Sequence, residues 1–121
     1  MDETKVMEYF LELLGQIKLF HWATLSYAKH KALDHLHDSL SELVDEFVEV
    51  YIGRFKKQPV KQATLTLKAH TDPSKMIKYL EDERDTLRKM HASFQKTTEL
   101  QTILDDMMKA VNQTLYLLHL D

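Results

Sequence analysis

LFHWATLSYAKHKALDHLHDSLSELVDEFVEVYIG, residues 19–53, contains the end of one apolar pattern, a short break at 23–26 and the whole of a second pattern. In the second pattern, apolar residues recur every three or four positions, which is the period of an amphipathic helix. Its apolar stripe consists of Leu33, Leu36, Leu40, Leu43, Phe47 and Val50. Gly53 follows at the place where a helix often ends in a left-handed residue. This stretch therefore predicts a helix that ends at about residue 52.

The same period occurs in three other segments. The first contains Gly15, which should cost about 1 kcal/mol relative to Ala inside a helix, and we attribute it to the close approach of a neighbouring helix. The third helix starts at Asp72-Pro73, with Asp as N-cap and Pro at the first helical position. The fourth opens at Thr98-x-x-Gln101, which resembles a capping box. The four predicted helices cover about 2–22, 27–52, 73–96 and 99–119.

Residues 54–71, RFKKQPVKQATLTLKAHT, are weakly patterned and contain no acidic residue. The run TLTLK alternates like a strand, but one isolated strand has nothing to pair with, so we expect a crossover connection with room for a short helix. Short links join the first helix to the second and the third to the fourth. Two helical hairpins joined by one crossover are the arrangement of a ferritin-like four-helix bundle. The predicted fold is all-α, with residues 1–121 as a single domain.

Composition limits the classes of function. The formal net charge of −3 does not favour a nucleic-acid partner, since phosphate contacts need clustered Lys and Arg, and we interpret the basic crossover as solvated. No apolar run is long enough to span a membrane, and the N-terminus does not resemble a signal or transit peptide, so we expect a cytoplasmic protein. There is no Cys. Metal chemistry would therefore use imidazole and carboxylate, and the chain has seven His.

Ligand-type residues follow one side of the second predicted helix, at the edge of its apolar stripe. His30 and Asp34 are one turn apart, and so are Asp45 and Glu49. The two pairs are separated by about 16 Å of helix rise, so they cannot hold one metal ion within one chain. An antiparallel copy of the helix would bring one chain's first pair beside its partner's second pair, and a two-fold dimer would make the site twice. His21, at the end of the first helix, faces the same bundle. Imidazole with carboxylate suits iron, manganese or zinc.

The same stretch resembles the signature of the Dps-type mini-ferritins, and the resemblance extends over nearly the whole chain. The matching residues are His21-Trp22, His30, Asp34, Asp45 and Glu49. The resemblance implies inter-subunit sites that bind Fe²⁺ and oxidise it with peroxide or oxygen, for iron storage or protection against oxidative stress. It also implies homo-oligomers built from a two-fold dimer, with storage of oxidised iron if a closed shell forms.

The resemblance further implies a role for each ligand. His21 and His30 would fix the metal, Asp34 and Glu49 would bind or bridge, and Asp45 would complete the site from the partner chain. Trp22 would lie beside the metal and quench radicals. The chain departs from the family in its short link from His21 to His30, in lacking a Lys-rich tail and in its short crossover, which could alter or abolish the usual shell.

Other interpretations stay open. A charged row beside an apolar stripe is often the solvated boundary of a helix. The chain could then be a non-catalytic ferritin-like dimer that acts as a protein-interaction module, or could hold zinc or manganese without turnover, so a ferroxidase activity is an open question. Asp34-x-x-His37 equals half of a di-iron motif within one bundle, but the fourth helix offers no Glu-x-x-His. The remaining histidines are interpreted as surface or hydrogen-bonded residues: His35, His37, His70, His91 and His119.

Overall fold

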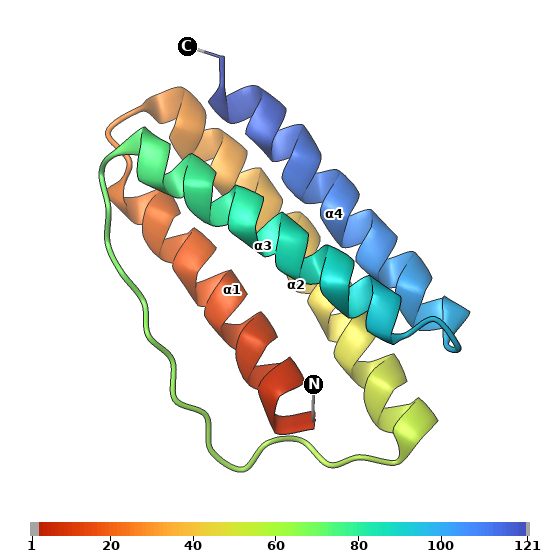
Figure 1. Ribbon diagram of the computed structural model, residues 1–121. Helices are drawn as coiled ribbons and strands as arrows, with labels where there is room; N and C mark the ends of the chain where they lie inside the picture. The colour runs from red at the N-terminus through yellow and green to blue at the C-terminus, as the bar shows by residue number, and fades with distance from the viewer. Residues whose placement is uncertain (1–2, 121) are drawn as a thin grey trace.

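The computed structural model describes residues 3–120, and within that range it contains four α-helices and no strand (Figure 1). The helices are α1 (Glu3–Ala23), α2 (Tyr27–Phe55), α3 (Pro73–Ser93) and α4 (Thr98–Leu118). The predicted all-α class with four packed helices is confirmed. The predicted first residue of the first helix, Asp2, lies outside the described residues, as does Asp121. None of the helices in the described range combines the length and apolar character that crossing a membrane requires.

The helices form two antiparallel hairpins, α1 with α2 and α3 with α4 (Figure 1). The extended segment 56–72, which we call the crossover, returns beside α1 along the length of the bundle, so α2 and α3 run in the same direction. The extensive helix contacts join α1 to α2, α2 to α4 and α4 to α3. Helices α1 and α3 are therefore the loosely joined neighbours.

The core is made of the apolar stripes that the helical period predicts. Its fully buried side chains come from all four helices: Phe10, Ile17, Leu33, Leu40, Leu80, Leu87, Leu104 and Val111. Phe47 of α2 is fully buried, with its ring centroid 5.1 Å from that of Phe10 and 5.8 Å from that of Phe94. Leu43 and Val50, also predicted to be core, are partly buried at its edge.

The predicted C-terminal end of α2 and the predicted capping box of α4 are wrong. Helix α2 continues past Gly53 to Phe55 and is capped by Lys56, whose φ of 55° and ψ of 44° are left-handed. Helix α4 begins after Thr97, and that N-cap makes no side-chain hydrogen bond. The amide of Gln101 instead donates to the carbonyl of His91 at 2.9 Å, so the predicted capping box does not form.

The third helix begins as predicted but ends early. The Asp72 Oδ1 accepts a hydrogen bond from the Ser74 N–H at 2.9 Å, and Pro73 is the first helical residue. This hydrogen bond lowers the pKa of the exposed Asp72 carboxyl. The helix stops at Ser93, three residues before the predicted end at 96.

The crossover is held to α1 by a ladder of side-chain to backbone hydrogen bonds. Acceptors spaced by four residues on α1 meet N–H groups spaced by two residues on the crossover. One helical turn rises about 5.4 Å and two extended residues rise about 6.6 Å, so the two periods nearly match. The bonds run from Thr64 N to Glu8 Oε2 (3.2 Å), Thr66 N to Glu12 Oε1 (2.9 Å) and Lys68 N to Gln16 Oε1 (2.9 Å).

The crossover also explains Gly15. A Cβ at this position would lie 3.2 Å from Leu67 Cδ1. The predicted close approach is present, but the partner is the crossover and not a neighbouring helix. Residues 56–72 contain no helix, so the room left for a short helix is not used.

Candidate functional site

Two histidines at the α1–α2 turn form a reciprocal pair. The rings of His21 and His30 stack with centroids 3.8 Å apart and planes 19° apart. The Nδ1 of His21 lies 2.8 Å from the carbonyl oxygen of His30, and the Nδ1 of His30 lies 2.7 Å from the carbonyl oxygen of His21. Because a carbonyl oxygen only accepts, both Nδ1 atoms carry a hydrogen. In the neutral rings each Nε2 therefore has a free lone pair.

The pair is positioned by the short turn between the helices. His21 is in the last turn of α1, and Ser26 caps α2 by accepting from the N–H of Lys29 at 3.2 Å. This cap starts α2 at once, so His30 is in its first turn and faces back to His21. His21 is 8 % exposed, as its position on the bundle-facing stripe predicts.

Asp34 lies one turn further along α2. Its Oδ1 is 3.8 Å from Nε2 of His21 and 3.9 Å from Nζ of Lys18. The structure thus brings together three of the five predicted ligands. Within the described part of the chain, however, no group of three His, Asp or Glu side chains is arranged to hold a metal ion.

The other two predicted ligands stand apart. Asp45 and Glu49 are exposed on α2, and helix rise places Asp45, the nearer of the two, about 16 Å beyond Asp34. The two pairs are therefore separated along α2, as their spacing in the sequence predicts. Trp22, which the family resemblance would place beside the metal, is 69 % exposed.

The interpretation of His37 as a surface or hydrogen-bonded histidine is wrong. Its Nδ1 is buried and makes no hydrogen bond within the described residues, and the nearest carboxylate oxygen, Oδ1 of Asp38, is 3.9 Å away. Burial, followed by the charge of Lys18, lowers the pKa of His37. The signal in the sequence was the three-residue spacing from Asp34, which places both side chains on one side of α2.

An apolar groove lies beside Asp45 on the outer face of α1 and α2. It has a volume of about 400 Å³, and Leu11 on its wall is 45 % exposed. The groove is lined by Leu11, Leu14, Ser41, Glu42, Val44, Asp45 and Val48. The row of ligand-type residues therefore continues into a surface with exposed apolar side chains.

Residues 21–118 match a family of unknown function (DUF5856). The chain belongs to this family. The match begins at His21 and includes all five predicted ligands. An uncharacterized 14.6 kDa protein from the mobD–ri intergenic region of Enterobacteria phage T4 is 31 % identical over 121 residues, covering 98 % of this chain and 91 % of the relative. No solved structure matches the chain.

Proposed function

We propose that this family member binds Fe²⁺ at sites between two antiparallel copies of the chain and oxidises it with peroxide or oxygen. The observation that carries the proposal is the His21–His30 pair. Metal-binding histidines usually donate their second ring nitrogen to a carbonyl or carboxylate, which orients the ring and exposes the other lone pair. Both rings already have this arrangement, with Nδ1 donating to a backbone carbonyl.

The geometry of α2 supports a second copy as the source of the remaining ligands. Consider two antiparallel α2 helices from two copies of the chain, with residue 30 of one copy opposite residue 49 of the other and residue 34 opposite residue 45. The two-fold axis of this dimer would then lie beside residues 39–40. Ser41 and Asp45 line the apolar groove next to that axis, so the same pairing would cover exposed Leu11. Each dimer would contain two equal sites.

The fold supports the same proposal at a coarser level. Two hairpins, one crossover and parallel α2 and α3 are the connectivity of ferritin-like bundles. We extend the proposal to membership of that fold group, with the dimer as the unit of any larger shell. Imidazole and carboxylate ligands suit Fe²⁺, and also Mn²⁺ or Zn²⁺. Each Fe²⁺ gives up one electron, so one peroxide molecule oxidises two ions.

Oxidation kinetics test the assignment. Fe²⁺ is added without oxygen, peroxide follows, and ferric absorbance is recorded. We expect Asp45→Ala and Glu49→Ala to slow the reaction by about tenfold or more, whereas Asp106→Ala, at an exposed carboxylate of α4, should keep the full rate. Equal rates in all four proteins would show that the assignment is wrong.

Subunit mixing tests the location of the site between chains. A heterodimer of His30→Ala with Asp45→Ala has one site with both defects and one intact site, so it should have about half the rate of the original dimer. In a random equimolar mixture about half of the dimers are heterodimers, so mixing should restore about a quarter of the rate. The matched control is His30→Ala mixed with His21→Ala, which leaves each site with one damaged histidine and should restore nothing. Restoration in neither mixture would contradict ligands shared between chains.

A second candidate function is a metal-free dimer that serves as a protein-interaction module. The observations in its favour are the exposed apolar groove and the lack, within the described residues, of three converged ligand side chains. Metal analysis of the purified protein together with its mass in solution separates the two candidates. A metal-free dimer favours the module, and a metal-loaded assembly favours the iron site.

A further inference from the structure

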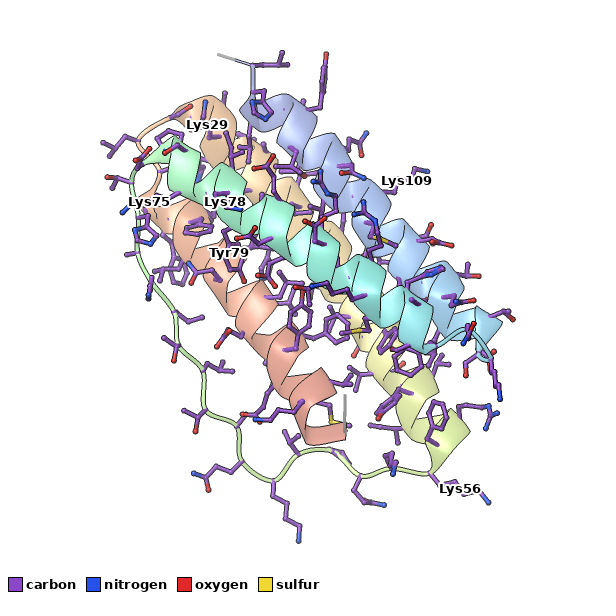
Figure 2. All side chains as sticks on the ribbon, viewed as in Figure 1. Lys29, Lys56, Lys75, Lys78, Tyr79 and Lys109 are labelled. Carbon is purple, nitrogen blue, oxygen red and sulfur yellow. The ribbon has the colours of Figure 1, made fainter. Side chains whose placement is uncertain are left out.

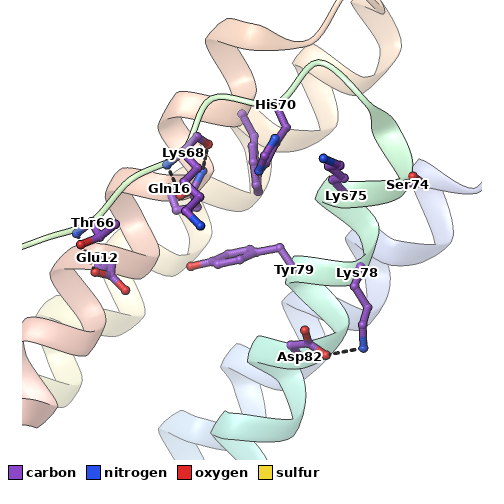
Figure 3. A pocket seen from close by; sticks show the side chains of 11 residues that line it. Glu12, Gln16, Thr66, Lys68, His70, Ser74, Lys75, Lys78, Tyr79 and Asp82 are labelled. Atoms are coloured by element: carbon purple, nitrogen blue, oxygen red, sulfur yellow. Dashed lines mark hydrogen bonds and ion pairs between the residues drawn. The ribbon is translucent and has the colours of Figure 1, made fainter.

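A groove of about 630 Å³ lies on the other side of α1, between α1, the crossover and the first turns of α3 (Figure 3). This volume is in the range of pockets that bind small molecules, about 300–1,000 Å³. The groove exists because α1 and α3 are not closely packed and the crossover spans the space between them. Its rim is fixed by Gln16, whose amide donates to the Lys68 carbonyl at 2.7 Å and whose oxygen accepts from the Lys68 N–H.

Aromatic rings form the inner wall of the groove. The ring of Tyr79 meets that of Phe20 edge to face, with centroids 5.4 Å apart, and His70 lies 6.3 Å from Phe20. Figure 3 shows the Tyr79 ring reaching across the groove towards α1. Burial, followed by the charges of Glu83 and Glu12, raises the pKa of the Tyr79 phenol. The ring is therefore a neutral flat surface with a hydroxyl group at its tip.

The charges on the groove are divided between its two ends. Lys68, His70 and Lys75 lie where the crossover reaches α3, whereas Glu12 and Asp82 lie at the opposite end, where Lys78 also lines the groove (Figure 3). Within residues 5–120, neither Lys68 nor Lys75 forms an ion pair, and Asp82 pairs with Lys78 at 2.8 Å. The nearby Asp72 carboxylate is used to cap α3 through Ser74.

We propose that this groove binds a mononucleotide-sized ligand with an anionic group, a planar ring and hydrogen-bond donors at the far end of the ring. The anionic group would lie between Lys68, His70 and Lys75. The ring would pack on Tyr79, since aromatic side chains stack on bases of any sequence. Amino groups of the ring would donate to Glu12 or Asp82. This site uses none of the residues of the proposed iron site.

Nuclear magnetic resonance of the full chain, labelled with ¹⁵N, tests the proposal with three probes. Adenosine monophosphate has all three features, adenosine lacks the anion and inorganic phosphate lacks the ring. We expect adenosine monophosphate to shift the Gln16 side-chain amide and the backbone signals of residues 66–79, and to bind at least about tenfold more tightly than either other probe. No shift at about 5 mM adenosine monophosphate would overturn the proposal. An affinity for phosphate equal to that for adenosine monophosphate would also overturn it, because the ring would then contribute nothing. An affinity for adenosine equal to that for adenosine monophosphate would overturn it too, because the anionic group would then contribute nothing.

Charge variants locate the ligand in the groove. The double variant Lys68→Gln/Lys75→Gln should lower the affinity for adenosine monophosphate about tenfold and leave that for adenosine unchanged. Figure 2 shows Lys75 and Tyr79 on the side of α3 that faces the crossover and Lys109 on α4, away from it. Lys89→Gln/Lys109→Gln, at exposed positions outside the groove, is the matched control and should bind like the original chain. An equal loss in both double variants would show only a general charge effect and overturn the proposed position.

Discussion

Helix α1 has two neighbours in the bundle and meets them in different ways. Towards α2 it is closely packed, and at the turn the rings of His21 and His30 each donate a hydrogen bond to the backbone carbonyl of the other residue. Towards α3 it is separated by a groove that the crossover spans. On that side, burial raises the pKa of Tyr9 and of Glu83, and the charge of Glu83 raises that of Tyr9 further.

The difference separates two ways of preparing a binding site. The α2 side fixes ring orientation through backbone hydrogen bonds, which suits ligands that need defined geometry, such as metal ions. The α3 side leaves space and places charged groups around it, which suits a ligand that fills a volume. Substitutions on the two sides should therefore have different energetic consequences.

The largest contrast is expected from removing an aromatic ring on each side. Phe47 on α2 is fully buried against Phe10, so Phe47→Ala should lower the free energy of unfolding by about 3–5 kcal/mol. Tyr79 on α3 is only partly buried beside the groove, so Tyr79→Ala should cost less than half as much. Urea denaturation measures both values. Equal losses would mean that the α3 side is packed as closely as the α2 side.

A double-mutant cycle on the histidine pair measures how strongly the α2 side is fixed. His21→Ala and His30→Ala should each cost about 1–3 kcal/mol, because each leaves a partly buried carbonyl without its donor. The coupling between them should be about 1 kcal/mol, from stacking and shared hydrogen bonds. The control cycle pairs His21→Ala with His91→Ala, at the distant end of α3, and should be additive. Additivity in the first cycle would contradict the reciprocal pair.

The same substitution at the two glycines tests the contact between α1 and the crossover. Gly53→Ala meets no atom within 4 Å and should stabilise α2 by about 0.5–1 kcal/mol through helix propensity. In Gly15→Ala the new Cβ makes a tight contact with the exposed side chain of Leu67. This variant should therefore be stabilised by less than Gly53→Ala. Thermal melting of both variants gives the difference. Adding Leu67→Ala to Gly15→Ala should restore the stabilisation that the contact with Leu67 removes. If the double variant shows no such increase in stability, the contact has no cost.

The smallest effect expected is a pH dependence on the α3 side. Burial raises the pKa of Glu83 in the folded state above its ordinary value of 4.5, so the folded chain binds this proton more tightly than the unfolded chain. The resulting loss of stability grows as the pH rises from the pKa of Glu83 in the unfolded chain to its higher pKa in the folded chain. Above the folded-state pKa the loss is complete. Glu83→Gln removes the loss, so its melting temperature relative to the original chain should rise from pH 4 to pH 8. Glu99→Gln, exposed on α4, controls for removal of a negative charge, and an equal rise in both variants would contradict the explanation.

Helical periodicity was sufficient to predict the four helices and most of the core, since each depends on residues close together in the sequence. Helix ends were harder. Gly53 resembles a terminator, but α2 continues until Lys56 adopts the left-handed conformation that a glycine adopts more easily. The partner of Gly15 could not be predicted, because Leu67 lies far along the chain and reaches α1 only after the crossover has folded back.

The candidate site, like the fold, could be predicted from the sequence only in part. The spacing of His30 and Asp34 places them on one side of α2, and the end of α1 brings His21 to them, as predicted. The reciprocal backbone hydrogen bonds depend on the conformation of the turn and leave no pattern in the sequence. Asp45 and Glu49 lie on the same helix but too far along it, and what stands opposite them is not determined by one chain.

The ladder between α1 and the crossover has a consequence for the order of folding. Its hydrogen bonds join residues 52–56 positions apart, so closing this loop has a large entropic cost that must be offset by several contacts formed together. The acceptors are in register only when α1 is helical, since a disordered α1 does not space them one turn apart. We therefore expect the α1–α2 hairpin to form first and the crossover to dock onto it afterwards. The docked crossover brings the chain back to the end of the bundle where α2 begins, so α3 starts there and runs parallel to α2. The direction of the second hairpin is therefore decided by the crossover, which contains no helix of its own.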